Sequence, residues 1–205
     1  MTRTSRRKRP LDREKHPLRD SRLVVIATEG ERTEPRYFRA FERVDSRVQV
    51  EVLETIDGES APKHVLERLR NYKRDHQIGK GDALFLVIDE DRWPSKQLSQ
   101  VASEARKLRC GFAVSCPCFD VWLYLHHADP PTEMAQMSSQ DVKAALRGLL
   151  GGYNPSNFNP DDFLPTLDDA IDRARSLDDD VSMRWPKRPG SRVYLVIESI
   201  CEKGS

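Results

Sequence analysis

The sequence predicts an α/β fold, with a mostly parallel sheet flanked by helices and a helical elaboration at the C-terminal end. Three observations support this. Between residues 20 and 130, short apolar runs alternate with longer amphipathic segments, which is the pattern of a parallel sheet with crossover helices. After residue 130 only helix-type periodicity continues. Finally, acidic residues directly follow two of the apolar runs, at the end of a parallel strand where ligands bind.

Four segments have the length and composition of strands. LVVIAT (23–28) and LFLVID (84–89) are continuous apolar runs, typical of strands that are covered on both faces. VQVEVLET (48–55) alternates between apolar and polar residues, and GFAVSC (111–116) is a fourth short run. Together they predict the parallel sheet.

The segments between these strands predict helices. The first begins after Thr33, a suitable N-cap, has Pro35 in its first turn and continues through YFRAFERV (37–44). The next two carry apolar residues on one face, and the last is strongly apolar throughout. These three segments are 61–79, 95–109 and 118–128.

Three further helices are expected in the C-terminal part, separated by polar loops that contain Pro and Gly. They cover residues 138–152, 160–177 and 191–204. We therefore divide the chain into a basic arm (1–21), an α/β core (22–130) and a helical elaboration packed on that core (131–205). A length of 205 residues suits this single elaborated domain.

Charge is distributed unevenly along the chain. The net charge is +1 overall, but residues 1–22 contain nine Lys or Arg against three acids, so the rest of the chain carries −5. A basic, apolar-poor arm suits a polyanion such as nucleic acid, and equally a solubilising tail. No apolar run approaches the ~20 residues of a membrane helix, and the N-terminus has no apolar signal region. We expect a cytoplasmic protein with no membrane segment.

Acidic residues at the strand ends predict a metal site. Glu29 follows the first strand, while Asp89 ends the third strand and Asp91 follows it. Alternate residues of an extended chain point the same way, so Asp89 and Asp91 share a side that Glu90 does not, and Gly30 permits a sharp turn after Glu29. If the two strands are neighbours, three carboxylates converge, and a hard divalent cation such as Mg²⁺ would relieve their repulsion. The alternative is that these acids only cap helices or lie in solvated loops.

Several common catalytic motifs are absent from the sequence. It contains no G-x-x-x-x-G-K-[ST] phosphate loop, no G-x-G-x-x-G after the first strand and no G-x-S-x-G elbow. The chain is therefore not expected to be an ATPase, a dinucleotide-binding enzyme or an α/β-hydrolase.

Three motifs, taken in order, resemble those of the RloB family. They are EGERTEPRYF (29–38), DEDRW (89–93) and PCFDVWLYLH (117–126). In the family they read roughly EGxxTEPxYF, DxDxxW and NPxFExWLxLHF. This chain departs from the third motif with Cys116, Asp120 and His127 in place of the family's Asn, Glu and Phe. In the second motif, Trp93 lies one residue closer to the second Asp than in the family pattern.

The resemblance implies a Toprim-like fold and a Mg²⁺-dependent nuclease, with Mn²⁺ as the other candidate metal. Glu29, Asp89 and Asp91 would be both the catalytic and the metal-binding residues, with Gly30 and Glu34 supporting them. Arg32, Arg36 and Arg92 flank these acids and could bind the phosphates of DNA or RNA.

The resemblance also implies a role in prokaryotic phage defence (abortive infection) with an ATPase partner protein. The oligomeric state stays open, with a homo-oligomer as one candidate, because the apolar 118–128 segment and the helical C-terminal part offer surfaces for pairing. Two other functions stay open. One is a non-catalytic nucleic-acid-binding or regulatory subunit, and the other is a different phosphoryl-transfer enzyme that uses a D-x-D motif.

Overall fold

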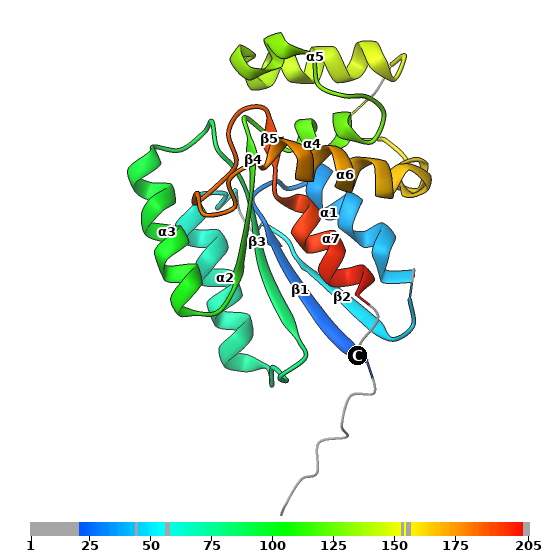
Figure 1. Cartoon of the computed structure of the whole chain (residues 1–205). Helices are drawn as coiled ribbons and strands as arrows, with labels where there is room; N and C mark the ends of the chain where they lie inside the picture. The colour runs from blue at the N-terminus through cyan, green and yellow to red at the C-terminus, as the bar shows by residue number, and fades with distance from the viewer. Residues whose placement is uncertain (1–20, 44, 56–57, 153, 155–156, 203–205) are drawn as a thin grey trace, which may run out of the picture.

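The computed structural model describes residues 21–43, 45–55, 58–152, 154 and 157–202. The basic arm expected at residues 1–21 lies outside this part of the chain, except for Ser21. The fold is α/β, with a five-stranded, mostly parallel sheet between two layers of helices (Figure 1), as the sequence predicts.

The sheet has the strand order β2-β1-β3-β4-β5. The first four strands run parallel, and the short β5 is antiparallel to β4. The strands are β1 (Arg22–Thr28), β2 (Val48–Leu53), β3 (Ala83–Asp89), β4 (Gly111–Cys116) and β5 (Gly190–Ser191).

Strand order creates a crevice between β1 and β3. The chain leaves β1 toward β2 on one side and returns to β3 on the other side of β1. The connections that follow these two strands therefore diverge at their carboxyl ends, and such a switch point is where open α/β sheets bind ligands. Glu29 and Asp89 lie at the two ends that meet here.

Successive side chains of β1 point to opposite faces of the sheet, and a layer of helices covers each face. Leu23, Val25 and Ala27 join one apolar cluster, which includes residues of α2 (Pro62–Asp75) and α3 (Ser95–Lys107). Val24 and Ile26 point the other way into a larger cluster, so both faces of the strand are buried. The helices that supply the larger cluster are α1 (Thr33–Arg39), α4 (Asp120–Leu125), α5 (Ser139–Leu149), α6 (Leu167–Leu177) and α7 (Val193–Cys201).

The C-terminal part also contributes to the sheet, beyond the boundary expected at residue 130. The segment 191–204 was expected to be one helix, but Gly190 and Ser191 pair with β4 before α7 begins at Val193. Gly190 is suited to this position because a Cβ there would lie 2.6 Å from the Lys187 carbonyl oxygen. The helix α7 then lies on the same side of the sheet as α1 (Figure 1), and its apolar residues belong to the larger cluster.

The segment 160–177 is also not one continuous helix. Two short 3-10 turns, η3 (Pro160–Asp162) and η4 (Leu164–Thr166), precede α6. Each turn contains a proline near its start, which lacks the N–H that a continuous helix would need. Two further 3-10 turns, η1 (Ala40–Arg43) after α1 and η2 (Thr132–Gln136) after α4, complete the described elements. In the residues described, no helix has the length and apolar character needed to cross a bilayer.

Candidate metal centre

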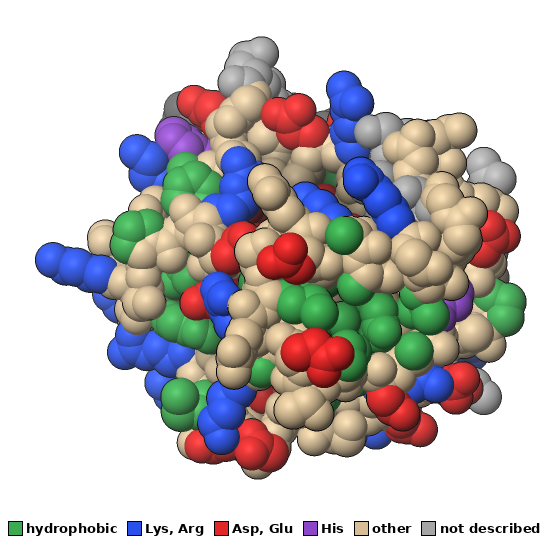
Figure 2. Space-filling view, turned by 90° about the horizontal axis from the view of Figure 1, so that it is seen from above, with side chains coloured by type: hydrophobic (Ala, Val, Ile, Leu, Met, Phe, Trp, Pro, Cys, Tyr) green, Lys and Arg blue, Asp and Glu red, His purple; other side chains and the backbone are tan. Residues whose placement is uncertain are grey.

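A cleft of about 520 Å³ opens at the carboxyl ends of β1 and β3. Figure 2 views this edge of the sheet from above and shows acidic and basic side chains interspersed over the surface. Five acids that line the cleft also interact electrostatically: Glu29, Glu34, Asp89, Asp91 and Asp120.

Asp89 and Asp91 share one side of the chain, as the alternation predicts. The backbone N–H of Phe119 donates a hydrogen bond to Asp89 Oδ1 (2.8 Å), and Ser139 Oγ donates one to Asp91 Oδ2. Within the residues described, no hydrogen bond involves Asp89 Oδ2 or Asp91 Oδ1. Each acid is therefore oriented through one oxygen while its other oxygen has no hydrogen-bond partner.

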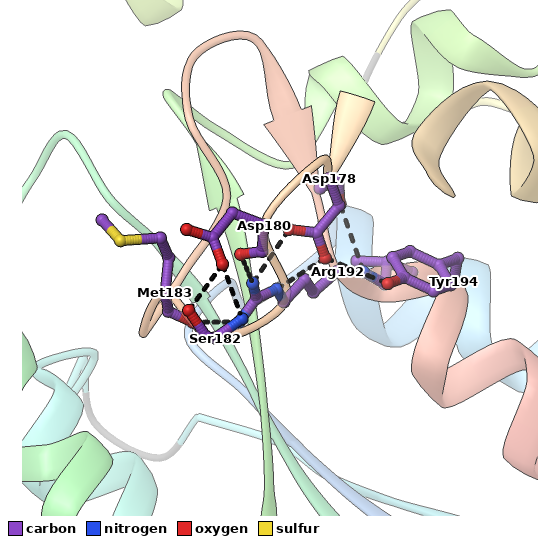
Figure 3. Close-up of polar contacts among 8 residues, drawn as sticks. Asp178, Asp180, Ser182, Met183, Arg192 and Tyr194 are labelled. Carbon is purple, nitrogen blue, oxygen red and sulfur yellow. Dashed lines mark hydrogen bonds and ion pairs between the residues drawn. The ribbon is translucent and has the colours of Figure 1, made fainter. Parts of the chain in front are cut away.

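Glu90 points away from the cleft toward the loop that precedes β5. Its carboxylate accepts hydrogen bonds from the Arg188 guanidinium, one of them 2.9 Å long. The same loop is held by the buried residue Arg192 (Figure 3). Arg192 donates two hydrogen bonds to Asp178 (2.7 and 2.8 Å) and one to the Met183 carbonyl (2.7 Å). Glu90, the central residue of the D-x-D motif, is therefore bound to a loop whose position Arg192 fixes.

Glu29 is buried beside Asp89, with 2% of its surface exposed. Its Oε2 accepts the Asp89 backbone N–H (3.1 Å), and its Oε1 lies 3.2 Å from Arg92 Nη1. Burial raises the pKa of Glu29, while the Trp93 indole, the Asp89 N–H and Arg92 oppose that shift. Arg92 therefore lies at the cleft as predicted, paired with one of its acids.

Glu34 reaches the cleft because residue 30 is glycine. A Cβ on Gly30 would overlap the Glu34 carboxylate. The chain bends at Glu29 and Glu31, around Gly30, as expected. Gly30 does not have a positive φ, so its missing side chain matters here because it leaves room for Glu34. Burial, followed by the charges of Asp120 and Glu29, raises the pKa of Glu34 to about 7.

Asp120 is a cleft residue that the sequence analysis did not include in the site. It is 5% exposed, and its Oδ1 is buried without a hydrogen-bond partner in the described part of the chain. Burial raises its pKa, whereas Lys143, Cys118 and Arg147 lower it. The signal was present in the sequence, because Asp120 occupies the acidic position of the third motif.

Ser139 and Lys143 also line the cleft, although they belong to the C-terminal elaboration. Both are on α5, which begins with a capping box between Ser138 and Asp141. The sequence contains the helix signal but nothing that indicates where this helix lies relative to the sheet.

The flanking arginines do not all lie at this cleft. Arg32 is exposed at the rim. Arg36, which we expected to bind nucleic acid here, lines a separate groove of about 750 Å³ and donates a hydrogen bond to the Phe158 carbonyl (3.3 Å). Arg36 lies within α1, one turn beyond the N-cap residue Arg32, so its side chain starts about 6 Å further along the helix axis and reaches the segment 157–161.

The acids repel one another strongly enough to perturb their ionisation. Burial raises the pKa of Asp89 well above its usual range, and the charges of Glu34, Glu29 and Asp120 raise it further. Such a cluster with an unpartnered buried oxygen suits a hard cation. Across the described ranges, however, no three or more His, Cys, Asp or Glu side chains are grouped so that they could hold a metal ion. Since Mg²⁺ typically uses one or two protein carboxylates together with waters and substrate phosphates, the residues fit an open site of that kind.

The fold and cleft define an α/β protein with an acidic site at the switch point of its sheet. The family model described as RloB-like protein matches residues 24–200. This match covers most of the chain, and the protein belongs to the RloB-like family. No curated protein matches the chain, and no solved structure matches it either.

Proposed function

We propose that this protein is a Toprim-type nuclease that hydrolyses the phosphodiester bonds of nucleic acid with the help of Mg²⁺ or Mn²⁺. The observation that carries the proposal is the convergence of five carboxylates in one cleft at the β1/β3 switch point. The carboxylates of the cleft repel a polyanion, and a bound cation would reduce that repulsion, so metal binding and phosphate binding would strengthen each other.

In this proposal Asp89 and Asp91 hold the metal through the oxygens that have no hydrogen-bond partner. Phe119 N–H and Ser139 Oγ keep the two carboxylates oriented. The bound metal would polarise a phosphoryl oxygen and lower the pKa of the attacking water.

Glu29 is the proposed general acid/base, or the ligand of a second metal if two ions bind. Its raised pKa brings it closer to neutral pH, which favours proton transfer. Arg92, paired with Glu29, can exchange this partner for a substrate phosphate because its side chain is 56% exposed. Glu34, placed over Gly30, supplies further negative charge next to Asp89.

The biological role follows from the family resemblance. We propose that the nuclease is an effector of a prokaryotic phage-defence (abortive infection) system and works with an ATPase partner. The absence of a phosphate-binding loop in this chain is consistent with a separate ATPase subunit.

A cleavage assay tests the proposal. The purified protein, alone and with the proposed ATPase partner, is incubated with plasmid, single-stranded DNA and total tRNA in Mg²⁺ or Mn²⁺. Cleavage should be abolished by Glu29→Gln and Asp89→Asn and kept by Asp168→Asn, which changes an exposed acid of α6.

Two outcomes would favour the other functions. If the wild type and both variants bind nucleic acid equally and nothing is cleaved under any condition, the protein is a binding or regulatory subunit. If small phosphomonoesters or free nucleotides are turned over while polymers stay intact, it is a different D-x-D phosphoryl-transfer enzyme.

A further inference from the structure

The helix α5 lies beyond the carboxyl-terminal edge of the sheet (Figure 1), and two of its residues line the acidic cleft. Val142 and Leu146 are buried and fix the helix against the rest of the molecule. Ser139, Lys143 and Arg147 are spaced four residues apart, so they form a strip next to this buried face. Ser139 and Lys143 line the cleft directly.

The two basic residues of this strip differ from the other cations near the site. Arg92 is paired with Glu29, and Arg188 is paired with Glu90. Lys143 and Arg147 are exposed and form no hydrogen bond or ion pair through their side chains in the part of the structure described. They are nevertheless close enough to Asp120 for both charges to lower its pKa.

We propose that Lys143 and Arg147 bind the phosphate backbone of a nucleic-acid strand and hold it against the carboxylates of the cleft. The two residues are about 6 Å apart along the helix axis, so that they can contact neighbouring phosphates of one strand. The choice of nucleic acid as the ligand rests on the proposed function. Binding of a strand by α5, however, does not require that the protein cleaves it.

The chemistry favours a phosphate strand over an acidic protein. A metal held by the carboxylates would require a ligand that offers phosphate oxygens on one side, and the cations of α5 would contact the same backbone from the other side. The alternative is that these cations only balance the negative charge of the acids. Replacing them would then change the stability of the protein without changing its affinity for nucleic acid.

Binding is measured by fluorescence anisotropy with short labelled single strands of DNA and RNA, in EDTA, over a range of salt concentrations. The variants are Lys143→Ala, Arg147→Ala, the double variant and Lys143→Arg. The control is Lys107→Ala, an exposed lysine in the last turn of α3. Thermal unfolding of each variant checks that the fold is retained.

Each single alanine variant should lose about one phosphate contact. For a single strand this makes the plot of log association constant against log salt concentration less steep by about 0.7. It also lowers the affinity about fivefold near 0.1 M salt. Lys143→Arg should keep the affinity of the wild type, because the charge is kept, and so should Lys107→Ala.

Wild-type affinity and slope in the double variant would overturn the proposal, and so would an equal loss in Lys107→Ala. Polyglutamate that competes as well as the labelled strand would overturn the choice of a phosphate ligand. Because the assay needs neither metal nor turnover, it separates the two claims. Binding that depends on Lys143 without any cleavage would support this inference and reject the nuclease. Cleavage by the wild type, with unchanged binding in the double variant, would support the nuclease and reject this inference.

Discussion

Replacing Arg192 by methionine should destabilise the protein strongly, because the change leaves a buried carboxylate without its partner. The side chains of Arg192 and Asp178 are 8% and 1% exposed. Two hydrogen bonds of 2.7 and 2.8 Å join them, and Tyr194 OH donates a third to Asp178 (3.0 Å). Burial and the hydrogen bond to Asp178 raise the pKa of Tyr194 to about 12, so it acts as a donor.

Removing one partner of a buried ion pair typically costs about 3–5 kcal/mol, because the remaining charge stays buried. The substitution also removes the donors to the carbonyls of Met183 and Asp180 (Figure 3). For a chain of this length, 1 kcal/mol corresponds to about 2–4 °C in Tm. The variant should therefore unfold about 6–20 °C below the wild type.

Urea unfolding followed by circular dichroism measures the free energy of unfolding. Asp178→Asn combined with Arg192→Met should lose less stability than the two single variants added together, because the double variant contains no unpaired charge. Lys187→Ala is the matched control, since Lys187 pairs with Asp179 in the same loop but both side chains are about two-thirds exposed. Its unfolding midpoint should not change. A loss below about 1 kcal/mol for Arg192→Met, the level of a surface pair, would refute the reasoning.

Two further predictions concern the cleft. In EDTA the free energy of unfolding should fall by about 3 kcal/mol as the pH rises from 4.5 to about 7, because in this window the folded state keeps the Glu34 proton that the unfolded state releases. Urea unfolding at about pH 5 and pH 8 measures this change. Glu34→Gln should reduce it and leave the part that comes from Glu29, Asp89 and Asp120, whose pKa values are also raised by burial, and a stability that rises with pH would contradict the prediction. Gly30→Ala should destabilise the protein by about 1–3 kcal/mol, because the new methyl group overlaps the Glu34 carboxylate. The same change in a Glu34→Ala background should cost much less, and an equal cost in both backgrounds would show that the overlap is not the cause.

Local periodicity carried most of the information about the elements and part of the site. The four parallel strands lie within one or two residues of the apolar runs that predicted them. The period of two in a strand also placed Asp89 and Asp91 on the cleft side, with Glu90 turned toward Arg188. These features depend on neighbouring residues, so the sequence pattern is sufficient to predict them.

Strand order and the positions of distant helices could only come from the tertiary structure. Glu29 and Asp89 converge only if β1 and β3 are neighbours. The strand order meets this condition, which no local pattern in the sequence reveals. Nothing local indicated that α5 would bring Lys143 to the cleft or that α1 would direct Arg36 to another groove.

The sequence by itself therefore determined the four parallel strands, most of the helices, which acids share a side and which family the chain resembles. The tertiary structure decided which of these acids meet and added Asp120 and Lys143 to them. It also paired Gly190 and Ser191 with β4 as β5 and packed α7 in the larger cluster. The physical reason is that the conformation of each segment follows from nearby residues, whereas the placement of segments depends on how the two apolar clusters pack over the whole chain.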